Sequence, residues 1–256
     1  MCATCGCDSN EKIFFHEHGN HADHEHTHNG HTHTHEKTVV EVEQDILYQN
    51  NLLAARNRGF LEAKNIFAIN LVSSPGSGKT TLLEKTLIAL KDKIEFAVIE
   101  GDQQTNLDAD RIHATGTKVV QINTGKGCHL DAHMVLHVLK GMQLKEHSVL
   151  FIENVGNLVC PAMFDLGENE RVVIMSVTEG EDKPLKYPEM FHSSTVCIIN
   201  KTDLLPYVPF NIEKAKEYAK RVNHKLHIIE LSCITGEGMQ EWYNWLYAKT
   251  TVQENA

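Results

Sequence analysis

A glycine-rich segment of the sequence has the residue types needed to bind phosphate. It reads SSPGSGKTT over residues 73–81, and it begins with Ser73 where the strict phosphate-loop pattern G-x-x-x-x-G-K-[ST] has glycine. Its glycines allow backbone N–H groups to surround phosphates at a helix N-terminus, while Lys79 can reach the β and γ phosphates and the Thr80 hydroxyl can hold Mg²⁺. A glycine-rich turn without a ligand is the alternative. The predicted phosphate-binding residues are Gly76, Ser77, Gly78, Lys79, Thr80 and Thr81.

Two further segments indicate which base the nucleotide carries. The residues Asn200, Lys201 and Asp203 belong to NKTD, which follows the apolar run STVCII. A carboxylate on Asp203 can accept hydrogen bonds from the N1–H and the 2-amino group of guanine, a donor pair that adenine lacks. LSCITGEG follows the next apolar run and offers Ser232 as a second base contact, with a plain turn as the alternative. The predicted ligand is therefore GTP or GDP.

Two acidic loops lie between these motifs. EGDQQT contains Asp102, and ENVGN contains Glu153 and Gly156. A carboxylate at either place can bind Mg²⁺, and Gly156 allows the backbone to sense the γ-phosphate, whereas ordinary surface acids are the alternative. Asn157, not glutamine, follows Gly156, so we expect slow intrinsic hydrolysis. The predicted catalytic residues are Lys79, Thr80, Asp102 and Glu153, and the last three are the predicted magnesium ligands.

Cysteine and histidine residues lie close to these loops in the sequence. Cys128 and His129 are adjacent in GKGCHLDAH, and Cys160 follows Glu153 by seven residues. Thiolate and imidazole groups suit Zn²⁺ or Ni²⁺, and a fourth ligand could be water, His133 or a residue of a second protomer. Buried structural cysteines beside a surface histidine are the alternative. Because Cys160 shares a loop with Glu153, we expect metal and nucleotide to change each other's affinity by the same factor.

Three more cysteines, Cys2, Cys5 and Cys7, lie in the N-terminal segment MCATCGC. Three thiolates and the α-amine of Cys2, once the initiator methionine is removed, would form a four-donor site that suits square-planar Ni²⁺. A redox pair and a chance cluster at the chain end are the alternatives. We therefore predict a nickel-binding site at the N-terminus.

The elements that must position these residues follow an α/β pattern. From residue 66 onward, short β-branched runs such as IFAINLVSS and SVLFIEN alternate with helical patterns such as KTTLLEKTLIAL. Near-continuous apolar strands separated by helices predict a P-loop NTPase fold, with a mostly parallel central sheet covered by helices on both faces. The predicted parts are a disordered metal-binding tail, an N-terminal helix, a GTPase domain with the switch-linked metal site and a C-terminal tail, at residues 1–38, 39–64, 65–250 and 251–256 respectively.

The composition restricts the location and the partners of the protein. The 256-residue chain has a net charge of −10 and no dense block of basic residues, so we expect neither nucleic acid nor a membrane as a partner. Nine histidines between residues 16 and 35 and few aliphatic residues predict that residues 1–38 are disordered. The odd number of cysteines and the absence of a signal-peptide pattern predict a cytoplasmic protein.

Taken together, the motifs resemble a known family. SSPGSGKTT, EGDQQT, GKGCHLDAHMV, ENVGNLVCP, TEGEDKPLKYP and NKTDLLP resemble the nickel-inserting GTPases of nickel–iron hydrogenase maturation, the HypB family. The resemblance implies a homodimerising GTPase of the SIMIBI class, in which Cys128, His129 and Cys160 form a switch-linked metal site and His133 is a further candidate ligand. It also implies two partners, a small zinc-containing nickel chaperone and the hydrogenase large-subunit precursor.

Several functions are compatible with these residues. The first is a GTPase that times nickel delivery, and the second is a nickel store in which GTP hydrolysis is secondary. A P-loop kinase for a small molecule is a third, against which NKTD and the Cys/His loops argue, and a nickel GTPase for urease is a close relative of the first. Lys183 and Lys186 in EDKPLKYP could reach a phosphate or a partner protomer, or could belong to a solvated loop.

Overall fold

Seven strands form one sheet in the computed structural model, which describes residues 39–103 and 107–252. The order is β3-β2-β4-β1-β5-β6-β7, and all neighbouring strands are parallel. The predicted α/β fold is confirmed, while the cysteines of the N-terminal tail lie outside the described residues. The strands are β1 (Phe67–Ser73), β2 (Phe96–Asp102), β3 (Lys118–Asn123), β4 (Val149–Glu153), β5 (Glu170–Ser176), β6 (Val196–Asn200) and β7 (His227–Glu230).

Alternate residues of the central strands face two different cores. In β1, Ile69 and Leu71 pack on one side of the sheet, whereas Ala68 and Val72 pack on the other. Because both sides are buried, the strand is apolar at nearly every position, which explains why the sequence shows continuous apolar runs there.

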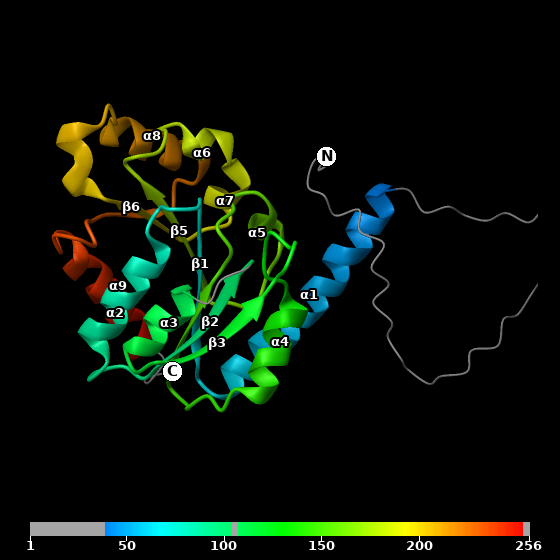
Figure 1. The fold of residues 1–256 in the computed structure, drawn as a ribbon. Helices are drawn as coiled ribbons and strands as arrows, with labels where there is room; N and C mark the ends of the chain where they lie inside the picture. The colour runs from blue at the N-terminus through cyan, green and yellow to red at the C-terminus, as the bar shows by residue number, and fades with distance from the viewer. Residues whose placement is uncertain (1–38, 104–106, 253–256) are drawn as a thin grey trace, which may run out of the picture.

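Helices cover both faces of the sheet (Figure 1). On one face α2, α3 and α9 contribute Leu83, Ile112 and Trp242 to the core. On the other face α1, α4, α7 and α8 contribute residues such as Leu61 and Phe191. The helices are α1 (Val39–Ala63), α2 (Lys79–Leu90), α3 (Leu107–Ala114), α4 (Ala132–Gly141), α5 (Cys160–Met163), α6 (Lys183–Lys186), α7 (Pro188–His192), α8 (Ile212–Val222) and α9 (Met239–Val252), with a 3₁₀ helix η1 at Thr202–Tyr207.

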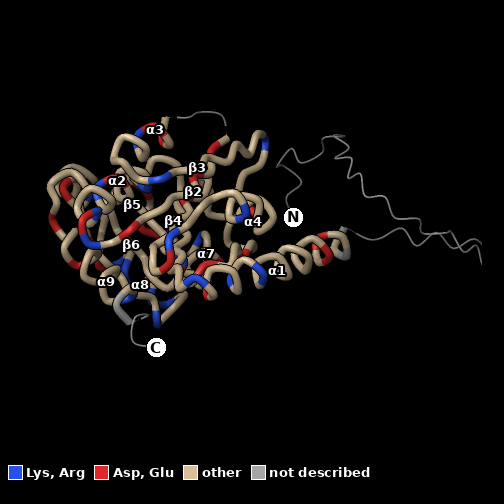
Figure 2. Tube along the Cα trace, turned by 90° about the horizontal axis from the view of Figure 1, so that it is seen from below, with Lys and Arg blue, Asp and Glu red and all other residues tan. Residues whose placement is uncertain are grey.

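The first half of α1 extends beyond the body of the molecule (Figures 1 and 2). Its side chains there are largely exposed, including Val42 and Ile46. Its second half packs against α4 and the sheet, where Ala54 and Leu61 are fully buried. Helix α1 is therefore joined to the body through its C-terminal half.

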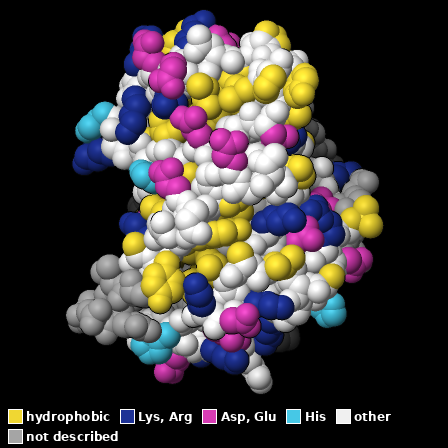
Figure 3. Space-filling view, turned by 90° about the vertical axis from the view of Figure 1, so that its left-hand side faces the viewer, with side chains coloured by type: hydrophobic (Ala, Val, Ile, Leu, Met, Phe, Trp, Pro, Cys, Tyr) yellow, Lys and Arg dark blue, Asp and Glu magenta, His cyan; other side chains and the backbone are white. Residues whose placement is uncertain are grey.

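Charged side chains of both signs are interspersed on the surface. Basic and acidic residues are both spread over the trace in Figure 2, and the face in Figure 3 carries both among hydrophobic side chains. Among the described residues, no helix combines the length and the apolar character that crossing a bilayer requires.

A candidate nucleotide site beside a cysteine and histidine cluster

The motifs lie at one edge of the sheet because all of its strands are parallel. The loops after β1, β2, β4 and β6 leave the carboxyl ends of their strands, and β1 lies at the centre between β4 and β5. In open parallel sheets, ligands bind outside these ends.

The phosphate loop joins β1 to α2 and depends on two glycines. Gly76 and Gly78 have φ angles of 74° and 99°, a backbone region that favours glycine. A Cβ on Gly78 would also collide with Nδ2 of Asn200. The loop keeps the first N–H groups of α2 available for an anion, since these groups have no partner within the helix.

Ser73, the departure from the strict pattern, holds the lysine of the loop. Lys79 Nζ donates a hydrogen bond of 3.0 Å to Ser73 Oγ, and this hydroxyl in turn donates to the carbonyl oxygen of Ser74 at 2.7 Å. A glycine could not make either bond. Ser73 therefore leaves the phosphate loop intact and gives Lys79 a hydrogen-bond acceptor.

The NKTD segment is fastened to the phosphate loop. Asn200 Nδ2 donates to the carbonyl oxygen of Ser77 at 2.9 Å, and Lys201 Nζ donates to that of Gly76 at 2.7 Å. Asp203 accepts a 2.5 Å hydrogen bond from the hydroxyl of Ser232. The structure thus brings the two predicted base segments together and places both beside the phosphate loop.

A buried carboxylate lies behind the loop. Thr80 Oγ1 donates a hydrogen bond of 2.6 Å to Oε1 of Glu153, which is 3% exposed, and the other oxygen of Glu153 has no partner. Burial raises the pKa of Glu153, while Lys79 and the Thr80 hydroxyl act in the opposite direction. Thr80 and Asp102 line a pocket of about 500 Å³ at the phosphate loop. A hydroxyl and two carboxylates, one of which has an unsatisfied oxygen, fit the ligand preferences of Mg²⁺.

Three charged residues in this region were missed by the sequence reasoning. Glu100 is 2% exposed, and burial and then the neighbouring Glu153 raise its pKa to about 8. Asp108 and Arg111 of α3 line the pocket, and Arg111 donates to Glu84 at 2.6 Å and to Thr81 at 3.2 Å. An acid inside the apolar run EFAVIEG was the visible signal for Glu100, whereas α3 carries no motif.

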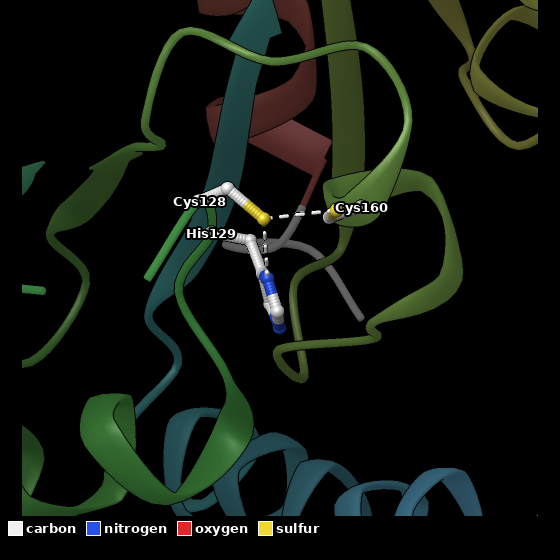
Figure 4. Close-up of side chains that lie close together, drawn as sticks. All are labelled: Cys128, His129 and Cys160. Carbon is white, nitrogen blue, oxygen red and sulfur yellow. Dashed lines mark hydrogen bonds between the residues drawn. The ribbon is translucent and has the colours of Figure 1, made fainter. Parts of the chain in front are cut away.

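The side chains of Cys128, His129 and Cys160 lie close together (Figure 4). The two sulfur atoms are 2.9 Å apart, and Cys128 Sγ is 3.6 Å from Nδ1 of His129. One possible ligand atom of each residue lies within 4.8 Å of the others. Neither thiol forms a disulfide with another described cysteine, and the two come from the β3–α4 loop and from the start of α5. The three donors predicted from spacing are therefore close enough to hold one metal ion.

The surroundings of His129 keep its ring in the form that binds metal. Burial lowers the pKa of His129, which favours the neutral imidazole. The ring packs against Phe164 with a centroid distance of 4.0 Å. His133 is not among the three clustered donors, and its ring instead lies against His137.

A short path of contacts connects the two sites. At Gly156 an added Cβ would lie 3.0 Å from Cα of Pro75, so the loop after β4 touches the phosphate loop. The next residue, Asn157, donates from Nδ2 to the carbonyl oxygen of Cys128 at 3.3 Å. The segment that begins at Glu153 and ends at Cys160 therefore contacts the phosphate loop and both sides of the cluster.

Helix α1 makes hydrogen bonds to segments that adjoin both loops of the cluster. Asn57 Nδ2 donates to the carbonyl oxygens of Ala132 at 2.9 Å and of Leu166 at 3.0 Å. Arg58 makes a two-pronged ion pair with Asp165 at 2.8 and 2.9 Å. One helix thus holds the start of α4, after His129, and the segment after α5.

The two lysines of EDKPLKYP have different surroundings. Lys183 Nζ donates to the hydroxyl of Ser74 at 2.9 Å and pairs with Glu179 at 3.1 Å, so it reaches the phosphate loop of its own chain. Lys186 pairs with Asp182 in an exposed position.

The fold and the phosphate loop define a P-loop nucleotide-binding protein. The sequence model of the CobW/HypB/UreG nucleotide-binding domain matches residues 67–230, and the chain belongs to this family and to its HypB branch. It is 57% identical over 211 residues to the hydrogenase maturation factor HypB of Escherichia coli K12, covering 82% of this chain and 73% of that protein. It is 59% identical over 208 residues to HypB of Azotobacter vinelandii, covering 81% and 69%.

Two solved structures are similar to most of the described fold. HypB from Archaeoglobus fulgidus matches with a TM-score of 0.75 and 42% identity, covering 79% of this chain and 99% of that chain. HypB from Helicobacter pylori in complex with nickel matches with a TM-score of 0.75 and 38% identity, covering 79% and 95%. The resemblance inferred from the motifs is thereby confirmed.

Proposed function

We propose that this protein is a GTPase that binds Ni²⁺ and couples GTP binding and hydrolysis to nickel insertion into the large subunit of nickel–iron hydrogenase. The observation that carries the proposal is the segment from Glu153 to Cys160. One end of this segment bonds the phosphate-loop threonine, and the other end supplies a thiol to the metal cluster. The names of the HypB relatives support hydrogenase maturation, and the nickel complex of one of them supports nickel as the cargo.

The nucleotide site has groups for each part of GTP. Lys79 would leave Ser73 to neutralise the β and γ phosphates, and Asp203 would exchange the Ser232 hydroxyl for the guanine N–H groups. Thr80, Glu153 and Asp102 would hold Mg²⁺, which would supply positive charge that stabilises the negative charge of the phosphates. Hydrolysis would be slow because the amide of Asn157 is engaged with Cys128 and with the N–H of Val159 rather than free to orient water.

The coupling follows from one hydrogen bond that the ligands must change. Thr80 and Glu153 are bonded directly to each other, so binding of a cation between them must lengthen or break that contact. Movement of Glu153 would be passed through Gly156 and Asn157 to the cluster. By linkage, the metal must then alter nucleotide affinity by the same factor.

The remaining parts of the proposal concern cargo, partners and location. The cluster of Cys128, His129 and Cys160 would carry Ni²⁺ or Zn²⁺, and Cys2, Cys5 and Cys7 would form a separate nickel site. We propose a cytoplasmic homodimer that meets a small zinc-containing nickel chaperone and the hydrogenase large-subunit precursor.

The direct test is metal titration of the chain without residues 1–38, bound to GDP and to a non-hydrolysable GTP analogue. We expect the metal Kd of the cluster to differ between the two states. An identical Kd in the GDP, GTP-analogue and nucleotide-free states would refute the coupling, and tighter binding of ATP than of GTP would favour a kinase.

Urease maturation is a second candidate function. The hydrogenase/urease maturation factor HypB of Helicobacter hepaticus is 46% identical over 185 residues, covering 71% of this chain and 76% of that protein. Deletion of the gene and assay of both nickel enzymes would separate the two roles. Deletion of residues 1–38 alone tests storage, because a pure store would lose its function while a GTPase would still deliver nickel when nickel is ample.

A further inference from the structure

Four buried polar side chains form a chain of hydrogen bonds on the sheet face that α1 and α4 cover. Asn154 Nδ2 donates to Oδ1 of Asn70 at 3.4 Å, and Asn70 Nδ2 donates to Oε1 of Glu168 at 3.1 Å. The same oxygen of Glu168 accepts hydrogen bonds from Nε and Nη2 of Arg171 at 3.0 and 2.8 Å. Each of the four side chains is at most 9% exposed. The chain therefore runs through the interior, from the end of β4 across β1 to β5.

One end of this chain holds the β3–α4 loop of the cluster. Asn154 Oδ1 accepts hydrogen bonds of 3.0 Å from the main-chain N–H of Leu130 and of 3.0 Å from that of Val155. Leu130 directly follows His129, and Asn154 directly follows Glu153. One side-chain amide therefore joins the loop of the cluster histidine to the segment whose carboxylate bonds the phosphate-loop threonine.

The other end of the chain holds the segment that carries Cys160. Arg171 Nη1 donates to the carbonyl oxygen of Ala162 at 3.0 Å, and Nη2 donates to that of Phe164 at 2.9 Å. These two carbonyl groups follow Cys160 by two and four residues. The two loops of the cluster are thereby tied to each other through buried side chains.

The burial of these groups is poorly explained by stability alone. Replacing a buried ion pair such as Glu168–Arg171 by apolar residues of similar volume is often neutral, because both charges lose their hydration. A polar network whose members are satisfied does fix one arrangement of the groups that it joins. Asn70 is 0% exposed in the otherwise apolar strand FAINLVS, and both of its side-chain bonds go to members of the chain. Its chemistry is therefore that of a connector.

We propose that four side chains are positioning residues of the metal cluster, namely Asn70, Asn154, Glu168 and Arg171. They hold the two loops at the separation that places the sulfur atoms of Cys128 and Cys160 2.9 Å apart. This arrangement exists before a metal ion binds, so little freedom of the two loops remains to be lost on binding.

The same chain gives Glu153 a route to both loops. When a cation separates Glu153 from Thr80, Asn154 shifts with its neighbour, and its bond to Asn70 weakens first because it is the longest of the chain. The two loops then change their separation, and metal affinity changes with it. This transmission rests on the proposed function, whereas the positioning does not.

The positioning is tested without metal or nucleotide. The sample is residues 39–256, which lacks the three cysteines of the tail, and the Archaeoglobus chain, of which 99% is covered by the match, indicates that this part folds alone. Oxidised glutathione converts the two thiols to a Cys128–Cys160 disulfide and releases two reduced glutathiones, and peptide mass analysis gives the equilibrium constant. Asn70→Leu should lower this constant by about tenfold or more, because the effective concentration of one thiol at the other falls.

Arg171→Lys is a second variant that breaks the chain at its other end. It keeps a positive charge beside Glu168 but lacks the forked guanidinium that reaches both carbonyl oxygens after Cys160. The equilibrium constant should fall in the same direction as in Asn70→Leu. If Asn70→Leu does not fold, Arg171→Lys decides the positioning.

The matched control is Thr86→Val on the opposite face of the sheet. Thr86 is 1% exposed and accepts a 2.9 Å hydrogen bond from Nε1 of Trp242, so valine leaves one buried donor without an acceptor, as Asn70→Leu does at Asn154. Urea unfolding should show a loss of stability in both variants, whereas the thiol equilibrium should change in Asn70→Leu alone. A constant that neither Asn70→Leu nor Arg171→Lys changes, or that falls equally in Thr86→Val, overturns the positioning.

Transmission is tested by the ratio of nickel Kd values in the GDP and GTP-analogue states of the same sample. In Asn70→Leu this ratio should move toward one by about threefold or more, with GDP affinity unchanged when metal is absent. An unchanged ratio overturns the transmission. A ratio of one in the unchanged chain overturns the proposed coupling and the transmission with it, while the thiol equilibrium still decides the positioning.

Discussion

The phosphate loop and the cysteine cluster lie at the same edge of the sheet but are built in different ways. The phosphate loop is a continuous segment whose shape is set by Gly76 and Gly78 and secured by two bonds from the NKTD segment. The cluster consists of three side chains on two loops, with Cys128 and Cys160 separated by 32 residues. Phosphate binding is therefore a property of local backbone, whereas the metal geometry changes with anything that moves either loop. A switch needs this difference, because one site must stay formed while the other responds.

The largest effect is expected at the phosphate loop. Gly78→Ala places a side chain in a left-handed backbone region and against Asn200, so we expect nucleotide affinity to fall by about 100-fold or more. Titration with a fluorescent GDP analogue measures this. Gly59→Ala is the control, because an added Cβ at this helical glycine meets nothing within 4 Å. Unchanged GDP affinity in Gly78→Ala would show that the loop is not preformed as described.

The next largest effect is expected at the cysteine cluster, whose geometry depends on the packing of two loops. Cys160→Ser removes one of three donors, so the metal affinity of the chain without residues 1–38 should fall by roughly 100-fold. Its GDP affinity should be unchanged when metal is absent. Cys197→Ala is the control. Burial raises the pKa of the Cys197 thiol to about 12, so this cysteine stays protonated and should not contribute to metal binding. Equal losses in the two variants would contradict the assigned cluster.

The buried carboxyl group of Glu100 predicts that stability depends on pH. The pKa of Glu100 is about 8 in the folded chain against an ordinary value of 4.5, so the folded state binds the extra proton between these values. Stability without nucleotide and metal should therefore fall as pH rises through this window, by at most about 1.4 kcal/mol per pH unit. Urea unfolding near pH 6 and near pH 8 should show a smaller decrease for Glu100→Gln. Parallel curves for the two proteins would show that this carboxyl is not responsible.

Asn157 tests the connection between the two regions. Its side-chain bond to the carbonyl oxygen of Cys128 is absent in Asn157→Ala, so each site should bind alone as before while the coupling falls by about 1 kcal/mol. The measurement is the ratio of metal Kd values with GDP and with the GTP analogue. Asn244→Ala on the exposed face of α9 is the control. A ratio that Asn157→Ala leaves unchanged would mean that the coupling takes another path.

The smallest effect is expected for the ion pair that joins α1 to the segment after α5. The Arg58–Asp165 pair is two-pronged but each side chain is 38% exposed, so Arg58→Lys should lower the free energy of unfolding by less than about 1 kcal/mol. Thermal unfolding measures this against Lys145→Ala, which removes a more exposed pair with Glu95. A loss of several kcal/mol would show that α1 contributes far more to the fold than its contacts indicate.

Parts of both regions could be predicted from residue types alone. The glycines, Lys79 and Thr80 identify a phosphate loop because their chemistry is carried by consecutive residues. The hydrogen bond from Lys79 to Ser73 could not be predicted, because the phosphate-loop pattern has glycine at position 73. Arg111 was missed because an arginine on a short polar helix has no distinguishing pattern until packing places it at the pocket. His133 was a candidate for the cluster by spacing, but the structure leaves it outside the three donors and next to His137.

The sequence by itself determined the α/β architecture, the phosphate loop and the identity of the three clustered donors. The first two features are local, because apolar runs and glycine φ angles act within a few positions of the chain, whereas the three donors were identified by residue type and lie on two loops. Only the tertiary structure decided that Thr80 bonds Glu153 and that Cys128 meets Cys160. The physical reason is the strand order, which places β4 beside β1 and so brings distant loops to one edge, and local propensities do not encode that order.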